Sequence, residues 1–220
     1  MMRKKWMQAV AAVIGMAALS SATAHAQGAA AQQKAVASEA QTDVAASFYQ
    51  AMTSSTSGNG TVQTPKNAMG GMLEVRHIHS SMIGYEFTYS FNPADQAFKP
   101  QVGNCGYRCN NQPLTITAGS NIIGLDWVFS KQYGNLRPFA VGGLGFTATV
   151  PSNSAYAANN TVRPTYIFGG GLDFALGGHF GVRAQVRDNI AKAPALSIYY
   201  SPTGAYTGII QPMGGVYYRF

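Results

Sequence analysis

The C-terminal residues alternate between two kinds of side chain. Every second residue is apolar or small, and these residues are Ile210, Pro212, Gly214, Val216, Tyr218 and Phe220. The residues between them are Gln211, Met213, Gly215, Tyr217 and Arg219. Because successive side chains of a β-strand point to opposite faces, this spacing predicts a strand with one apolar face. The other face is more polar and carries an arginine.

The N-terminal residues are typical of a secretory signal peptide. Three basic residues at positions 3–5 precede an apolar stretch over residues 6–18, and an A-x-A cleavage motif ends at Ala26. The apolar stretch is shorter than the about 20 residues that a membrane-spanning helix needs. We therefore expect residues 1–26 to be a cleaved signal peptide and the mature chain to be exported.

Few residues are charged. Asp, Glu, Lys and Arg make up 10% of the chain, and the formal net charge of +7 falls to +4 when the three basic residues of the signal are lost. This excess is small and scattered, and no basic patch is interleaved with aromatic residues. We therefore expect no nucleic-acid partner.

The two cysteines, Cys105 and Cys109, are separated by three residues. An exported chain meets an oxidising compartment, so we expect a disulfide within one loop. Half of a metal site is the competing interpretation, but His77, His79 and His179 fall on distant segments. No phosphate-binding motif is present either, because the glycine-rich run at 169–178 lacks the Gly-Lys-Ser/Thr ending. We expect neither a metal nor another cofactor.

Eight segments have the length of membrane-crossing strands, which need about 9–11 residues. They are residues 43–54, 67–79, 82–92, 120–130, 136–149, 164–176, 179–190 and 208–220. Long connections rich in Asn, Ser, Pro and Thr alternate with short turns, and the long ones are residues 55–66, 93–119, 150–163 and 191–207. This pattern predicts an all-β fold, an eight-stranded antiparallel transmembrane β-barrel built as an up-and-down meander. The barrel domain would span residues 43–220, after a flexible periplasmic lead-in at 27–42.

Alternation alone does not tell which face is wet, because a soluble β-protein would bury its apolar face. Lysine is absent from the strand interiors, although a solvent-facing sheet would use it freely. The strand cations are arginines, which pair well with carboxylates. We therefore predict an apolar outer face and a lumen ion-pair network of Glu74, Arg76, Glu86, Asp126, Asp173, Arg183, Arg187 and Arg219. The facing of the first and fifth strands stays open.

Ring position predicts the partners in this network. In a ring of eight strands, the third faces the seventh and the fourth faces the eighth. Glu86 would therefore face Arg183 and Arg187, and Asp126 would face Arg219.

Two further features depend on the short turns. Asp173 and Arg183 would be direct cross-strand neighbours if the turn at residues 177–179 is three residues long. Aromatic residues gather at the short-turn end, where a membrane girdle would lie, and they are Phe129, Phe174, Phe180, Tyr218 and Phe220.

One cluster contains the residue types of a Ser/His/acid hydrolase, such as the small barrels that deacylate lipid A. Its members are Glu74, His77, His79, Ser80 and Ser81. If Glu74 faces the lumen, alternation turns both histidines outward, near the periplasmic end. Lipid A lies in the opposite leaflet, so we expect no enzymatic activity.

Three segments resemble the later strands of small outer-membrane β-barrel proteins of the OmpA/OmpX type. They are RPFAVGGLGF, YIFGGGLDFALGGHFGVRAQVR and MGGVYYRF. The resemblance implies localisation in the outer membrane, contact with its lipids and a monomeric state. It also implies that Phe220 and Tyr218 are the signal read by the outer-membrane assembly machinery. The peptidoglycan-binding domain of larger members is not expected here.

Two classes of function remain. The first is a structural or surface-interaction protein whose lumen is plugged by Arg–carboxylate pairs and whose loops are displayed for contact with an unidentified extracellular ligand. An eight-stranded barrel has an interior just wide enough for side chains, which favours this class. The alternative is a narrow diffusion channel for ions or very small solutes.

Overall fold

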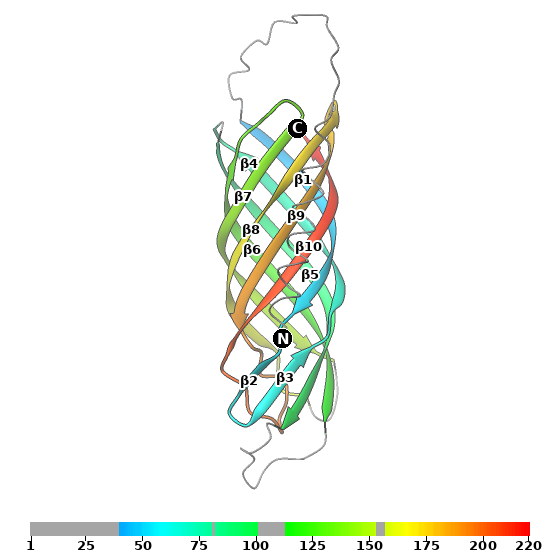
Figure 1. Ribbon diagram of the computed structural model, residues 1–220, viewed down its shortest axis with the longest axis vertical. Helices are drawn as coiled ribbons and strands as arrows, with labels where there is room; N and C mark the ends of the chain where they lie inside the picture. Colours follow the sequence, from blue (N-terminus) through cyan, green and yellow to red (C-terminus); the bar gives the residue numbers. More distant parts are fainter. Residues whose placement is uncertain (1–39, 81, 101–112, 153–156) are drawn as a thin grey trace, which may run out of the picture. The chain divides into compact units, whose positions relative to one another are not determined.

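The computed structural model describes residues 40–80, 82–100, 113–152 and 157–220, and these belong to one compact unit. Eight long antiparallel strands form a closed barrel, and a short hairpin extends it at one end (Figure 1). The barrel strands are β1 (Gln41–Thr53), β4 (Ala68–Ile78), β5 (Ile83–Pro100), β6 (Leu114–Ser130), β7 (Leu136–Pro151), β8 (Thr161–Gly177), β9 (Phe180–Lys192) and β10 (Tyr206–Arg219). The hairpin consists of β2 (Thr56–Gly58) and β3 (Thr61–Pro65).

The first and last strands close the ring. β10 pairs with β9 on one side and with β1 on the other, where Asp43 lies opposite Arg219. Every other neighbour in the ring is the next long strand along the chain, so the predicted up-and-down meander is confirmed. The alternating C-terminal residues form the closing strand.

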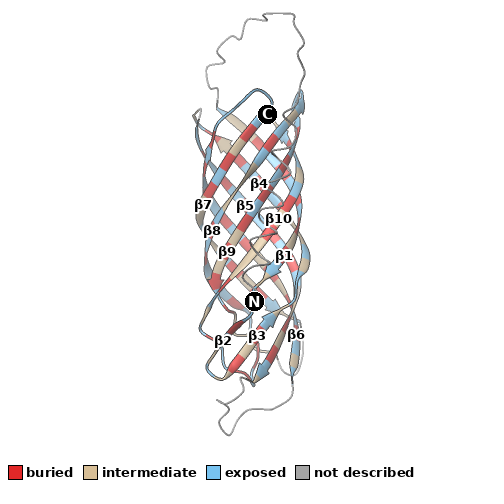
Figure 2. Ribbon diagram, in the orientation of Figure 1, coloured by how far each residue is buried: buried red, intermediate tan, exposed pale blue. Residues whose placement is uncertain are grey.

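Buried and exposed residues alternate along the barrel strands (Figure 2), and the inner and outer faces are inverted relative to a soluble protein. Large apolar side chains point outward, as Phe48 does at 76% exposure and Trp127 at 59%, whereas Arg76 and Glu74 are fully buried inside. Alternation explains this inversion, because the residues between the outward apolar positions are those that fill the lumen. Among the described residues, no helix has the length and hydropathy needed to cross a bilayer.

Two predicted long connections are wrong in part. Residues 55–66 contain the hairpin β2–β3, and residues 93–119 contain the end of β5 (93–100) and the start of β6 (114–119). β3 pairs with β5 from Thr61 opposite Pro100 to Pro65 opposite Gln96, so this hairpin extends the sheet beyond the start of β4, at the end of the barrel that carries the long connections. Local composition hid these strands, because their stability comes from pairing between distant segments.

The turn between β8 and β9 also differs from the prediction. Gly177 pairs with Phe180, which leaves a turn of two residues, and a bulge between Ala175 and Gly177 supplies the extra residue. Gly177 and Gly178 have φ angles of 126° and 56°, which glycine adopts without strain. The bulge restores the register, so Asp173 and Arg183 are direct partners as predicted.

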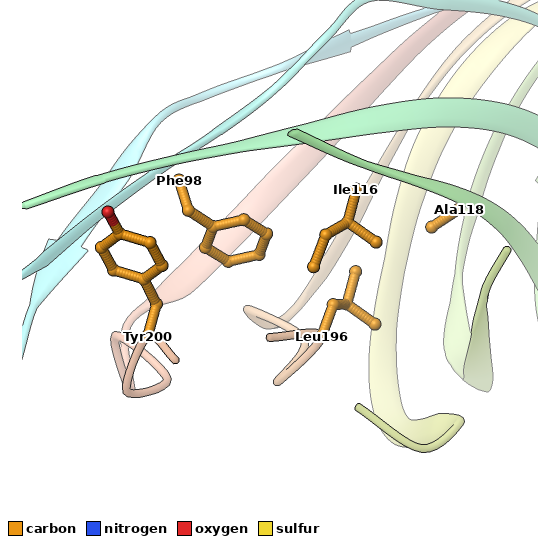
Figure 3. Close-up of a cluster of buried hydrophobic side chains, with 5 residues drawn as sticks. All are labelled: Phe98, Ile116, Ala118, Leu196 and Tyr200. Carbon is orange, nitrogen blue, oxygen red and sulfur yellow. The ribbon is translucent and has the colours of Figure 1, made fainter. Parts of the chain in front are cut away.

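An apolar cluster lies at the end of the barrel that carries the long connections (Figure 3). Leu196 and Tyr200, from the segment between β9 and β10, face strand residues Phe98, Ile116 and Ala118. Leu196 is fully buried, and the rings of Phe98 and Tyr200 stack with centroids 6.0 Å apart. We call residues 193–205 the cap segment, because they cover the inner faces of β5 and β6 there.

Candidate functional site: the lumen ion-pair network

Three arginines and five carboxylates are joined by ion pairs inside the barrel. They are Arg76, Arg183, Arg187, Asp43, Glu74, Glu86, Asp126 and Asp173, and we call them the lumen network. Six of the eight barrel strands contribute a member, because the inward positions of neighbouring strands fall at similar depth in the half nearer the short turns. Each member is at most 2% exposed.

Arg183 is the most highly connected member. Its Nε donates to Asp173 Oδ1 at 2.7 Å, directly across the β8–β9 ladder. Its Nη1 donates to Glu74 Oε2 at 2.5 Å and its Nη2 to Asp43 Oδ1 at 2.8 Å. One guanidinium group therefore links β9 to β8 beside it and to β4 and β1 across the lumen.

Glu86 is shared between two arginines. Its Oε2 accepts from Arg76 Nε at 2.6 Å, and its Oε1 accepts from Arg187 Nη1 at 2.7 Å. Arg187 also donates to Asp126, and Arg76 Nη1 donates to Asp173 Oδ2 at 3.1 Å. The structure thus brings Glu86 together with Arg187, and it places Glu86 3.9 Å from Arg183.

Arg219 lies outside the network, and its predicted pairing with Asp126 is wrong. The cross-strand pairs lead from Arg219 through Asp43, Arg76 and Glu86 to Asp126. The strand of Asp126 is therefore opposite the strand of Arg219 in the ring, as predicted. Neighbouring strands are about 4.8 Å apart, and because the strands are tilted by about 40°, paired residues on neighbouring strands differ in height along the barrel axis by about 3 Å. Four such steps amount to about 12 Å along the axis. Arg219 therefore stays at the short-turn end, with its Cζ 5.4 Å from the centroid of the Tyr217 ring.

Aromatic rings complete the network. The Cζ of Arg76 is 4.0 Å from the centroid of the Phe139 ring, and that of Arg183 is 5.6 Å from the same ring and 5.4 Å from the Tyr217 ring. Sequence reasoning missed Asp43 and Phe139, which belong to the two strands whose facing was left open. Tyr217 alternates with the outward apolar residues of the C-terminal strand, and the sequence therefore placed Tyr217 on the inner face.

Over the half nearer the cap segment, most of the described lumen side chains are polar and uncharged, and Arg163 on β8 is an inward-facing cation among them. Four side-chain pairs lie there, Tyr49 with Asn92, Gln63 with Gln96, Asn189 with Gln211 and Thr147 with Thr165. Hydroxyl and amide groups that bond to one another in this way satisfy buried polar atoms without charge. The described lumen therefore changes from an ion-pair network near the short turns to mostly uncharged polar side chains and finally to the apolar cluster of the cap segment.

The network cross-links the barrel strands through its ion pairs. Five carboxylates against three guanidinium groups leave two negative charges in excess, and Arg137 and Arg219 lie nearby at the short-turn end. Among the described carboxylates and histidines, no group of three or more could hold a metal.

The structure separates Glu74 from the histidines of the hydrolase-like cluster. Glu74 is inside the barrel with Arg183, whereas His77 Nδ1 is 2.9 Å from Thr42 Oγ1 on the outer side. Ser80 Oγ accepts from the backbone N–H of Ile83. Ser81, and also the predicted disulfide residues Cys105 and Cys109, lie outside the described residues.

The girdle residues lie on the outer face. Phe220 and Phe180 are 72% and 61% exposed, and Tyr218 lies between them with ring centroids 5.2 Å and 5.1 Å away. The backbone N–H of Phe220 donates to Thr42 O at 2.9 Å, which ties the last residue to β1.

The fold is that of small bacterial outer-membrane barrels. The chain is similar to the outer membrane protein OprG from Pseudomonas aeruginosa, with a TM-score of 0.59, 13% identity and coverage of 83% of this chain and 97% of that one. It is also similar to Neisserial surface protein A, with a TM-score of 0.53, 11% identity and coverage of 83% and 99%. A third similar structure is the attachment invasion locus protein of Yersinia pestis in complex with the heparin analogue sucrose octasulfate, with a TM-score of 0.51, 15% identity and coverage of 83% and 99%. No family model and no curated protein matches the sequence.

Proposed function

The chain has the fold of the eight-stranded outer-membrane barrels, and on this basis we propose that it is a structural, surface-interaction protein of the outer membrane with a plugged lumen. The observation that carries the proposal is the set of ion pairs from Arg183 to Asp43, Glu74 and Asp173, which joins four strands across the interior. An eight-stranded barrel has an interior that side chains fill, so a network spanning it leaves no room for solute. The short turns would lie in the periplasm and the long connections outside the cell.

The cap segment supports closure at the other end. Three hydrogen bonds hold it to the β7–β8 connection and to the β2–β3 hairpin. Ala158 N–H donates to Leu196 O at 2.8 Å, Asn59 Nδ2 donates to Pro202 O at 2.8 Å, and Thr203 Oγ1 donates to Thr56 Oγ1 at 3.2 Å. Because its own residues Leu196 and Tyr200 are buried against the strands, this segment would keep covering the end of the barrel while the chain is in the membrane.

The same segment offers a contact surface. Ile198 and Tyr199 are 59% and 50% exposed and lie between the buried Leu196 and Tyr200. Ser197 Oγ accepts from the backbone N–H groups of both tyrosines at 3.2 Å, which fixes the turn. Exposed aromatic and aliphatic side chains on a fixed loop are suited to anchor a partner. The Yersinia pestis complex makes sucrose octasulfate the first probe to try.

Single-channel conductance of the refolded mature chain in a planar bilayer tests the plugged lumen. We expect stable insertion without steady current for the wild type and for the lipid-facing control Leu125→Ala. A reproducible small conductance that Glu86→Ala or Arg187→Ala alters would contradict the plug and establish the alternative, a narrow diffusion channel with those residues at its constriction. Recovery of the chain in the soluble periplasm would contradict the membrane location itself.

A further inference from the structure

A lysine and a tyrosine lie on the outer face of the barrel, at the end that carries the long connections. Lys192 and Tyr206 are direct cross-strand partners on β9 and β10, and both point outward. The Nζ of Lys192 lies 5.7 Å from the centroid of the Tyr206 ring, and the ring is 58% exposed. Among the described residues, no ion pair involves Lys192. Its charge is therefore presented to whatever surrounds the barrel.

An acidic residue lies below them on the same face. Asp188 is four residues from Lys192, between the lumen-facing Arg187 and Asn189, and it points outward. Its Oδ1 is buried against β10 and has no hydrogen-bond partner among the residues that the structure describes. A Cβ atom at Gly208 would lie 2.8 Å from that oxygen, so the glycine makes room for the carboxylate against β10.

The two charges lie on opposite sides of a membrane boundary. An outer-membrane barrel has an apolar band about 25 Å tall, and each residue of a tilted strand rises about 2.5 Å along the axis. Counted from Phe180 in the aromatic girdle, Asp188 lies about 20 Å up and Lys192 about 30 Å up. Asp188 is thus just inside the band, while Lys192 and Tyr206 are at the headgroup level.

We propose that this outer face of β9 and β10 binds one phosphorylated glycolipid of the outer leaflet, of the lipid A type. Lys192 pairs with a phosphate, and the Tyr206 ring lies against a sugar. Asp188 accepts hydrogen bonds through Oδ2, the oxygen that is not buried against β10, from amide or hydroxyl groups where the acyl chains begin. A carboxylate without a partner in the apolar band needs such donors, because leaving it unpaired there is costly. The inference rests on the orientation given under the proposed function.

Native mass spectrometry of the full mature chain in nanodiscs measures lipid retention. Lipid A competes there with phosphatidylglycerol, which has a phosphate but no amide or hydroxyl donors on its acyl chains. We expect one retained lipid A, and a loss of affinity of about tenfold for Lys192→Ala, the effect of one charge-assisted contact. Asp188→Leu should weaken retention of lipid A but not of phosphatidylglycerol.

The chain supplies a matched control. Lys131 lies over the Tyr133 ring at 5.4 Å, at the opposite end of the barrel, so Lys131→Ala removes the same kind of pair without touching the site. Gly208→Ala, which keeps the charge but displaces the carboxylate, should behave like Asp188→Leu. Equal losses for Lys131→Ala and Lys192→Ala, or unchanged retention in the Asp188 variant, would overturn the proposal.

Orientation is measured separately, so that its failure is distinguishable. An Ile198→Cys variant in a chain without Cys105 and Cys109 should react with a membrane-impermeant maleimide on intact cells. If it is labelled only after lysis, the orientation is reversed and the proposed function fails with it. If it is labelled on intact cells and the lipid result is negative, only the lipid site is lost.

Discussion

The guanidinium carbon of Arg76 lies 4.0 Å from the centroid of the Phe139 ring. Arg183 lies over the same ring at 5.6 Å. β7 contributes no charged member to the lumen network, and it supplies instead a flat apolar surface against two of the three arginines. Such a ring attracts the cations electrostatically and keeps water from their ion pairs, which strengthens those pairs.

Replacing Phe139 should therefore destabilise the barrel in two steps. Phe139→Leu keeps an apolar side chain and loses the cation–π contact, which costs about 1–2 kcal/mol in a desolvated site. Phe139→Ala also leaves a cavity, and we expect a total of about 3–5 kcal/mol. Urea unfolding of the chain in lipid vesicles measures both, with Phe146→Ala on the lipid-facing side of β7 as the control. A leucine variant as stable as the wild type would show that the ring itself contributes nothing.

Removing one partner of the network should cost more than removing two. Arg187→Met leaves Asp126 without a cation and Glu86 with Arg76 alone, and an unpaired buried charge destabilises by about 3–5 kcal/mol. Adding Glu86→Gln to that variant should recover part of the loss, with a coupling energy of about 1–3 kcal/mol. The same double-mutant cycle on the exposed pair Lys66–Asp95 should give at most about 1 kcal/mol. Additive losses for Arg187 and Glu86 would mean that they do not act as a pair.

Ring position could be predicted from the sequence, and height along the axis could not. Period-two alternation and the up-and-down order identify which strands face each other, so the pairing of Glu86 with Arg187 followed from the sequence. The stagger between strands depends on the shear of the closed barrel, which no local pattern records. The sequence therefore placed Asp126 and Arg219 on opposite strands but could not show that they lie at different heights.

Residues contributed by irregular strands were missed for a related reason. β7 has small residues on both faces, among them Gly142, Gly143 and Gly145, so its alternation does not show that Phe139 points inward. The cap segment falls within the predicted long connection 191–207, and the sequence did not show that it is buried. The burial of Leu196 depends on strand residues more than 70 positions away in the sequence. Contacts of this range leave no periodic signal.

Phe220 should matter for assembly and not for stability. Its side chain is 72% exposed on the outer face, so Phe220→Ala removes little buried surface and should leave urea unfolding in vesicles unchanged. If the terminal aromatic is the signal read by the assembly machinery, the same variant should accumulate less in the outer membrane of cells. Phe180→Ala, a girdle residue of similar exposure, is the control and should assemble normally. Equal cellular levels of wild type and Phe220→Ala would remove the assembly role.

Asp95 allows a test of electrostatics above the membrane. Lys66 Nζ donates to its Oδ2 at 3.0 Å and Thr117 Oγ1 to its Oδ1 at 2.8 Å. These hydrogen bonds, the one from Lys66 first, lower the pKa of Asp95 below its ordinary value. A carboxylate whose pKa is lower in the folded chain stabilises the fold above its unfolded pKa of about 3.9 and loses that contribution as the pH falls through the folded pKa.

An NMR titration of the Asp95 carboxyl carbon should therefore give a midpoint below about 3.9 in the folded chain. Lys66→Ala should move the midpoint upward but not fully, because the hydrogen bond from Thr117 remains. Thr117→Val in the same chain should bring it the rest of the way. Lys99→Ala removes a lysine from the same strand as Asp95 and should leave the midpoint nearly unchanged. Salt screens the charge interaction of a lysine that makes no direct hydrogen bond to Asp95. A midpoint that responds equally to the loss of Lys66 and of Lys99 would show that general charge, and not these two hydrogen bonds, sets the pKa of Asp95.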